Sequence, residues 1–269
     1  MTAVATDLAT RAAQHADALF AAFQRGEPVA PPTASDAALD ADGAYAVQRA
    51  LVDRHRAAGR RVVGRKIGLT SLAMQRQLGV PEPDYGVLLD SHAWASGATL
   101  GRGVERMIAP RLEAELAFVL DRALTGPGVT AGAVLAATRA VVPVWEIIDS
   151  RVRDWQITLA DTIADNASCL GVVVGDGATA ASGLDLRTVG LVLERDGEVL
   201  ATGAGAAVLG HPARAVAWLA NALGRHGEEL PAGQLVLSGS FTAAVDAQPG
   251  SYRASFGAGL GSVEVRIDA

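Results

Sequence analysis

The sequence predicts an α+β fold, with a mainly antiparallel, β-rich core preceded by a small helical N-terminal lobe. Helical periodicity dominates only residues 1–60. From Arg61 onward, short apolar runs are broken by glycine and proline. These runs outnumber the later helical segments and do not alternate strictly with them, which argues against a parallel α/β sheet. We therefore expect two parts, a helical lobe at 1–60 and a β-rich domain at 61–269.

The N-terminal lobe is predicted to contain two helices. Apolar residues recur at helical spacing from Leu8 to Phe23, and Gly26 followed by Pro28 ends this first helix. Residues 28–35, PVAPPTAS, are the best linker candidate. A second helix is expected over 42–58, with a glycine as its C-cap.

The second part is predicted as short strands with a few helices between them. The expected strands are 61–69, 113–120, 141–148, 169–174, 189–193, 234–238 and 262–267. The expected helices are 71–79, capped by Ser71, then 130–140, and 212–226, opened by Pro212. Asp196-Gly197 indicates a two-residue hairpin. Residues 82–86, Glu-Pro-Asp-Tyr-Gly, suggest a turn, and the polar stretch 149–168 suggests a loop that either covers a site or is simply capped.

Composition excludes several classes of function. No window approaches the roughly 18 consecutive apolar residues of a membrane span, and the N-terminus lacks a basic patch before an apolar run, so neither a membrane protein nor a signal peptide is expected. The net charge is -6 with both signs interspersed, which argues against nucleic acid as a partner. Cys169 is the single cysteine, so no intrachain disulfide can form and a cytoplasmic location is expected.

Two glutamates in one expected strand are the first candidates for chemistry. Because side chains alternate between the faces of a strand, Glu113 and Glu115 point the same way, and Leu112 and Ala114 point the other way. Two carboxylates on one face repel each other unless solvent or a cation lies between them. A solvent-facing pair is the plain alternative.

A third glutamate lies in a similar setting. Glu146 stands inside the almost wholly apolar run 141–148, and a glutamate is rarely buried without a partner. Three carboxylates from two strands would supply the oxygen ligands that Mg²⁺ or Mn²⁺ prefers. The five histidines are scattered without ligand spacing, which disfavours zinc.

Lys66 and Asp84 are weaker candidates. Lys66 lies in an apolar strand between glycines, which allow a ligand to approach the backbone closely. It could hold an anionic substrate or move a proton, although a lysine taken alone is more often a surface residue. Asp84 is an acid–base candidate, or simply a turn-forming residue.

Taken together, these segments resemble the 2-keto-4-pentenoate hydratase and 4-oxalocrotonate decarboxylase group of the fumarylacetoacetate hydrolase superfamily. The matching segments run in unbroken order from about Tyr45 to the C-terminus. They are VVGRKIGLTS, QLGVPEPDYGVLL, APRLEAELAFVL, EIIDSRVRDW, DTIADNASC, GAGAAVLGHPARAVAWLANALG and QLVLSGSFT.

The resemblance implies a fold, a metal and a set of site residues. The fold is the fumarylacetoacetate hydrolase C-terminal type with a helical N-terminal lobe, in a homo-oligomer. The carboxylates of Glu113, Glu115 and Glu146 would hold Mg²⁺ or Mn²⁺. Catalytic roles would fall to Lys66 and Asp84, and substrate binding to Leu69, Thr70 and Ser168.

The implied activity is metal-dependent addition of water to a 2-hydroxy-2,4-dienoate, giving a 4-hydroxy-2-oxo acid, as in the breakdown of aromatic compounds. The first alternative is decarboxylation of a 2-oxo-3-enedioate, which uses the same metal apparatus. The motifs at 153–155 and 161–169 favour the hydratase. Another alternative is a non-catalytic partner subunit, because hydratase and companion decarboxylase are expected to associate. A carbon–carbon hydrolase would need a His–Glu dyad in the lobe, and neither His15 nor His55 has a clear motif around it.

Overall fold

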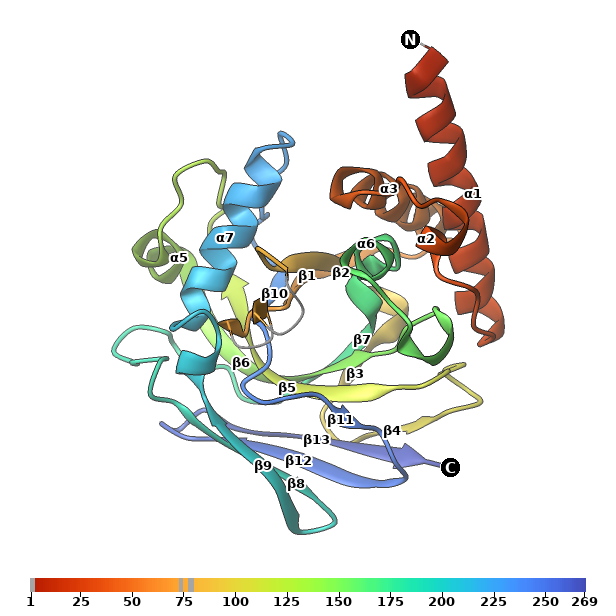
Figure 1. Cartoon of the computed structure of the whole chain (residues 1–269). Coiled ribbons are helices and arrows are strands. Elements are labelled where there is room, and N and C mark those ends of the chain that lie inside the picture. Colours follow the sequence, from red (N-terminus) through yellow and green to blue (C-terminus); the bar gives the residue numbers. More distant parts are fainter. Residues whose placement is uncertain (1–2, 73–74, 77–79) are drawn as a thin grey trace.

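The computed structural model describes residues 3–72, 75–76 and 80–269. Two β-sheets form its core, one above the other, with helices against the larger sheet (Figure 1). The predicted helix at 71–79 lies partly outside the described residues. No described helix combines the length and the apolar character needed to cross a membrane.

The larger sheet has eight strands in the order β2-β1-β10-β5-β6-β7-β3, with β11 paired to β5. Their bounds are β1 Val62–Gly68, β2 Asp84–Leu89, β3 Ala93–Ala95, β5 Arg111–Leu120, β6 Thr138–Ile148, β7 Cys169–Val174, β10 Leu235–Leu237 and β11 Val245–Asp246. The smaller sheet has the order β4-β13-β12-β8-β9. Its strands are β4 Ala98–Gly101, β8 Gly190–Arg195, β9 Glu198–Ala204, β12 Gly250–Phe256 and β13 Gly261–Asp268.

Both sheets are mixed. The pairs β1–β10, β3–β7 and β4–β13 are parallel, and the other pairs among the described strands are antiparallel. The prediction of an α+β fold with a mainly antiparallel, β-rich core is confirmed.

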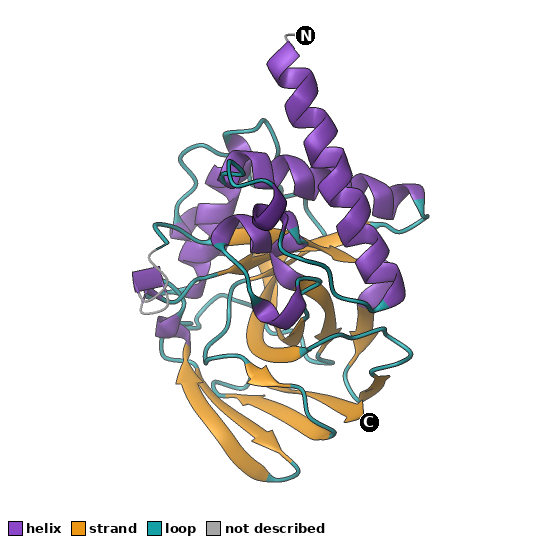
Figure 2. Ribbon diagram, turned by 45° about the vertical axis from the view of Figure 1, so that its right-hand side comes forward, coloured by secondary structure: helices purple, strands orange, loops and turns teal. Residues whose placement is uncertain are grey.

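The described helices lie on both faces of the larger sheet: the N-terminal helices and residues 159–164 lie on the side away from the smaller sheet, whereas residues 131–137 and 212–224 pack in the same apolar cluster as the smaller sheet (Figure 1). They are α1 Ala3–Arg25, α2 Pro32–Ser35, α3 Ala41–Ala57, α5 Ala131–Ala137, α6 Leu159–Ala164 and α7 Pro212–Gly224. In Figure 2 the N-terminal end of α1 projects beyond the body of the molecule. Its later turns pack with α3 and α6 in one apolar cluster, and Gln48 of α3 donates to the carbonyls of Tyr85 and Ile163, at 2.8 and 2.9 Å.

The core between the sheets sets the direction of the side chains on β5. Leu112, Leu116 and Phe118 are fully buried in the cluster that contains Tyr252 and Val263 of the smaller sheet. Alternation then turns the glutamates of β5 toward the opposite face, the side on which α6 lies. On that face Ala117 packs in a separate cluster with residues of β2, β6, β7 and β10.

Three local predictions need correction. The expected turn at 82–86 contains the start of β2, whose residues are all buried; a proline just before a strand costs no ladder hydrogen bond. The helix expected to reach residue 140 ends at Ala137, where Thr138 donates its hydroxyl to Val134 and begins β6. The polar stretch 149–168 contains α6, which begins with a capping box between Thr158 and Asp161.

Candidate active site and metal centre

The three glutamates predicted as metal ligands lie together. Glu113 of β5 and Glu146 of β6 are direct cross-strand partners, and Glu115 follows on the same face of β5. One carboxylate oxygen of each lies within 4.8 Å of the others. Glu115 and Glu146 are fully buried, and Glu113 is partly exposed. The sheet register therefore brings the cluster together from residues 31 to 33 positions apart in the sequence.

Lys66 and Asp84 complete this group. The Nζ atom of Lys66 lies 3.2 Å from Oε1 of Glu146, and both side chains are buried. Asp84 is 2% exposed and is paired across the strands with Gly68. A Cβ atom at Gly68 would lie 2.2 Å from Oδ1 of Asp84, so any larger residue here would displace the Asp84 carboxylate.

Burial and repulsion between like charges govern the electrostatics. Burial raises the pKa of Glu146 to about 7, although Lys66 opposes the rise. Burial and then the charges of Glu146 and Glu113 raise the pKa of Glu115 well above its usual value. Burial also raises the pKa of Asp84 against the opposing effect of Lys66. For Lys66, burial disfavours the cation, but the neighbouring carboxylates outweigh it and raise the pKa.

The cluster fits a divalent cation. Neither carboxylate oxygen of Glu146, nor Oε1 of Glu115, nor Oδ1 of Asp84 has a hydrogen-bond partner among the described residues. The Lys66 ammonium is an ion-pair partner of Glu146, 3.2 Å from Oε1. Three carboxylates carry three negative charges when ionised, and Lys66 offsets one of them. The donors are all hard oxygens, which suit Mg²⁺ or Mn²⁺.

A cavity of about 390 Å³ opens beside the cluster. Its polar lining includes Lys66, Asp84, Glu113, Thr162 and Ser168. The hydroxyl oxygens of Thr162 and Ser168 lie 3.2 Å apart. The cavity thus combines acid–base groups, hydroxyl donors and an edge of the carboxylate cluster.

Two of the three predicted substrate-binding residues line the cavity. Leu69 and Ser168 line the cavity, both with left-handed backbone, at φ 57° and 55°. The side-chain amide of Gln75 donates to the Leu69 carbonyl at 2.7 Å and holds it in place. Thr70 is buried against Gly239 and is not among the described residues that line the cavity.

Sequence reasoning missed Arg111, which lies against Trp155. The guanidinium carbon of Arg111 lies 4.4 Å from the centre of the Trp155 ring, and Nε donates to Asp246 at 3.1 Å. Both residues line the cavity, together with Ile148 and Ile157. Arg111 lies two residues before Glu113 on β5 and therefore on the same face of the strand. The two-residue pattern that found the glutamates could also have found this arginine.

A larger hollow of about 710 Å³ lies on the outer face of the smaller sheet. Charged residues of both signs line it, and Arg253 and Glu264 form an ion pair at 3.6 Å. The side chains of this pair are about half exposed, so water screens their charges and weakens their interaction with a ligand. We place the site in the smaller cavity because it contains the buried ionisable groups.

The histidines of the lobe have structural roles. His55 is buried between Phe20 and Phe23, with ring centroids at 5.1 and 4.7 Å, and burial lowers its pKa to about 3. His15 lies 3.8 Å from Asp36. Neither contact is the His–Glu dyad that the hydrolase alternative needs.

Known proteins resemble this chain in both sequence and structure. Residues 68–268 match the family model described as fumarylacetoacetate (FAA) hydrolase C-terminal. The chain is 47% identical over 211 residues to the 2-hydroxypent-2,4-dienoate hydratase of Pseudomonas putida, covering 78% of this chain and 95% of the relative. It is 45% identical over 224 residues to the 4-oxalocrotonate decarboxylase of Pseudomonas sp. strain CF600, covering 83% and 84%.

Among solved structures, the chain superimposes on the 4-oxalocrotonate decarboxylase from Pseudomonas putida G7 in complex with magnesium and adipate. The TM-score is 0.90 at 36% identity, over 100% of both chains. Family model, sequence relatives and structure agree, and the chain belongs to the fumarylacetoacetate hydrolase family.

Proposed function

We propose that this protein is a divalent-metal-dependent hydratase that adds water to a small 2-hydroxy-2,4-dienoate and produces a 4-hydroxy-2-oxo acid. The observation that carries the proposal is the buried carboxylate cluster beside Lys66 and Asp84, open to a cavity of about 390 Å³. The 47% identity to a named hydratase supports the choice of reaction.

Glu113, Glu115 and Glu146 would hold Mg²⁺ or Mn²⁺, as the magnesium in the related decarboxylase structure suggests. The bound ion would supply Lewis acidity toward the substrate's carboxylate and 2-oxygen. It would also offset the effects of burial and of repulsion among the three carboxylates, which together raise the pKa values of Glu115 and Glu146.

The chain's own residues would then bind the substrate and move protons. Lys66, held beside Glu146, would stabilise negative charge that develops on the substrate. Asp84 lines the cavity, and burial raises its pKa, which suits proton exchange with the attacking water. The hydroxyl of Ser168 and the backbone at Leu69 would position the substrate carboxylate. Ile148 and Ile157 would exclude bulk water.

Decarboxylation of a 2-oxo-3-enedioate is the second candidate. The lining residue Arg111 favours it, because its guanidinium could pair with a second carboxylate. The named decarboxylases at 45% identity and in the superimposed structure also support it.

An ultraviolet assay separates the two reactions. The purified protein with Mg²⁺ is given 2-hydroxypenta-2,4-dienoate or 2-oxohex-3-enedioate in separate cuvettes, and products are identified by mass. The proposal expects loss of the dienoate with a gain of one water, abolished by chelation and restored by Mg²⁺. Carbon dioxide release from the diacid alone would favour the decarboxylase. Activity on neither would favour a non-catalytic partner or another substrate.

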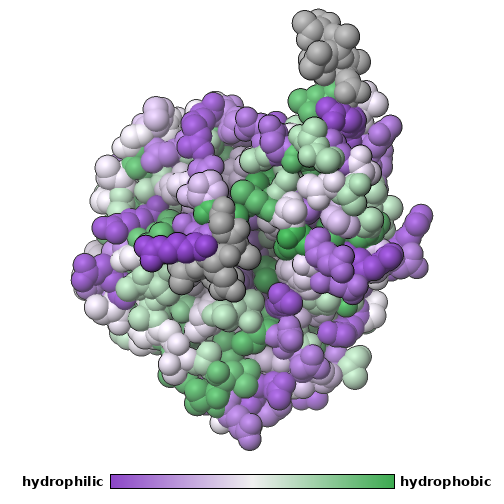
Figure 3. Space-filling model, in the orientation of Figure 1, coloured by the Kyte–Doolittle hydropathy of each residue, from purple (hydrophilic) through white to green (hydrophobic). Residues whose placement is uncertain are grey.

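We further propose that the protein is a cytoplasmic homo-oligomer that associates with a companion decarboxylase. We also propose a division near residue 60 between the N-terminal lobe and the catalytic domain. Exposed apolar side chains on β8 and β9, Val192, Val199 and Leu200, offer a surface for assembly. Figure 3 shows hydrophobic residues gathered low on the molecule, where these strands lie. Light scattering of the purified chain, alone and with a decarboxylase, tests this assembly.

A further inference from the structure

The turn that carries Ser168 has an unfavourable backbone. Asn166, Ala167 and Ser168 form one 3-10 turn, with φ of 55°, 50° and 55°. Residues with a Cβ atom disfavour this left-handed region, and three in succession are held there only when surrounding contacts fix them. Contacts with the rest of the protein must therefore stabilise this turn.

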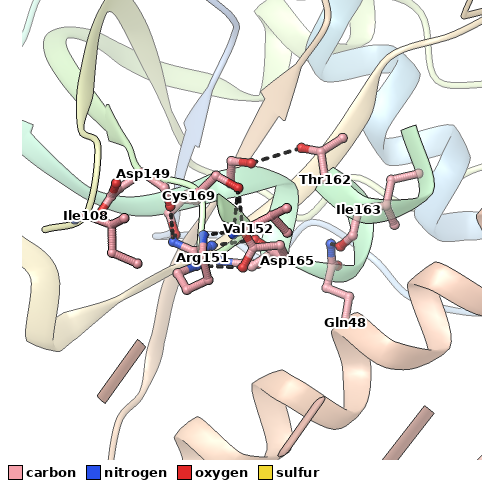
Figure 4. A network of polar contacts seen from close by, with 12 residues as sticks. Gln48, Ile108, Asp149, Arg151, Val152, Thr162, Ile163, Asp165 and Cys169 are labelled. Carbon is pink, nitrogen blue, oxygen red and sulfur yellow. Dashed lines mark hydrogen bonds and ion pairs between the residues drawn. The ribbon is translucent and has the colours of Figure 1, made fainter. Parts of the chain in front are cut away.

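A buried ion pair clamps both ends of this turn (Figure 4). Asp165, just before it, accepts from Nε of Arg151 at 2.6 Å and from the Arg151 backbone at 2.9 Å. The same guanidinium donates to the carbonyl of Cys169, just after the turn, at 3.0 Å. Ser150 adds a hydrogen bond to Asp165 at 3.2 Å. Both charged side chains are almost fully buried, so water competes little for these bonds.

The turn is also fastened to the strand that carries Asp84. The side-chain amide of Asn166 donates to the carbonyl of Val87 at 3.0 Å and accepts from its backbone at 2.8 Å. A Cβ atom at Gly86 would lie 2.4 Å from the Asn166 carbonyl oxygen, so glycine is needed for this close approach. Ser168 and Asp84 are thus fixed relative to each other through one short segment.

We propose that Arg151 and Asp165 are positioning residues of the active site, which act by holding the left-handed turn so that the Ser168 hydroxyl points into the substrate cavity. Neither residue is among those that line the cavity. Their effect on substrate binding therefore passes through the turn that carries Ser168. The kinetic part of the test rests on the proposed hydratase function, whereas the backbone part does not.

The central variant is Asp165→Asn, assayed in the Mg²⁺-loaded protein well below its melting temperature. We expect a rise in KM of about tenfold or more, the scale of one lost hydrogen bond to a charged group, with a smaller change in kcat. Ser168→Ala should raise KM similarly, and the double variant should be no worse than the more severe single variant. Full additivity of the two effects would show that Asp165 does not act through Ser168 and would overturn the proposal.

A second substitution tests the backbone strain itself. Ala167→Gly removes the steric penalty of the left-handed region, so adding it to Asp165→Asn should restore much of the lost affinity. Hydrogen–deuterium exchange should show faster exchange at 166–169 in Asp165→Asn and recovery in the Ala167→Gly double variant. This readout needs no turnover, so a failed hydratase assay would leave the positioning proposal testable.

The matched control is Asp36→Asn, which removes the carboxylate from the Arg11–Asp36 pair of the lobe, where Asp36 is 9% exposed. It should leave KM and the exchange at 166–169 unchanged. If Asp165→Asn does not fold, Ser150→Ala removes one of the hydrogen bonds to Asp165 and keeps the ion pair; faster exchange and a several-fold rise in KM are expected. Wild-type KM and exchange in the folded variant would refute the proposal.

Discussion

Two faces of this molecule carry charged side chains at alternate strand positions, with opposite outcomes. On the outer face of the smaller sheet, Arg253 and Glu264 stand opposite each other, 3.6 Å apart, and both are about half exposed. On the face of the larger sheet turned toward α6, Glu113 and Glu146 are also cross-strand partners, yet they carry the same charge. Glu146 is completely buried.

This contrast separates charges that keep a surface soluble from charges that serve a reaction. An exposed pair of opposite charges contributes about 0–1 kcal/mol and can be replaced with little effect. Buried like charges oppose folding, because each loses hydration and repels its neighbours. A cluster that folding disfavours is a candidate for function, and the outer face provides a matched control for every test of it.

The largest expected effect is loss of activity on changing the cluster. Glu113→Gln should lower kcat/KM by about 10³-fold or more, because one proposed ligand of the ion becomes a neutral amide. Binding of Mg²⁺, measured by titration calorimetry, should weaken in parallel, with the circular dichroism spectrum unchanged. Glu264→Gln on the outer face should retain full activity. Wild-type turnover in Glu113→Gln would remove the metal assignment.

The next effect is on stability. Lys66→Met should lower the free energy of unfolding by about 3–5 kcal/mol at pH 8, because the buried carboxylates lose their neighbouring cation. Arg253→Met, which breaks an exposed pair, should change it by no more than about 1 kcal/mol. Urea denaturation of the metal-free proteins measures both. Equal changes in the two variants would contradict the distinction between the faces.

A smaller effect concerns pH. The folded pKa of Glu146, about 7, lies above its unfolded value of 4.5. The stability that Glu146 contributes to the fold is therefore fully present below about pH 4.5 and is lost as pH rises through about 7. Metal-free Glu146→Gln should become more stable relative to wild type between pH 5 and pH 8. The buried His55 and the partly buried His92, whose pKa values are lowered by desolvation, act in the opposite direction but cancel in this difference.

Melting temperatures of both proteins, recorded across that pH range, test the sign. Added Mg²⁺ at pH 8 should stabilise the wild type and have little effect on the variant, because the ion binds the native state. A stability difference that does not depend on pH would mean that Glu146 titrates normally in the fold.

The smallest effect is at the cavity wall. Arg111→Gln should raise KM for an anionic substrate by about tenfold, the scale of one charge-assisted hydrogen bond. Stability should hardly change, because its partner Asp246 is 72% exposed. A larger loss for 2-oxohex-3-enedioate than for the dienoate would place a second carboxylate at Arg111. Arg266→Gln on the outer face is the control.

Much of the site was predictable because strand alternation is local. Glu113 and Glu115 are two residues apart, so their carboxylates lie on the same face of any strand that contains them. Glu146 stood out as a charge in an apolar run. The same reasoning missed Arg111, although it shares that face, and it mistook the start of β2 for a turn because the proline and glycine around Asp84 are typical of turns.

The sequence alone indicated which residues could share a face, that most of the described part of residues 1–60 is helical, and which carboxylates are candidates to bind a hard divalent cation. Only the tertiary structure decided that Glu113 faces Glu146, that Lys66 pairs with Glu146, and that Arg151 and Asp165 hold the turn of Ser168. The physical reason is that side-chain direction follows from local backbone geometry, whereas register, burial and ion pairing depend on residues distant in the sequence that meet only when the chain folds.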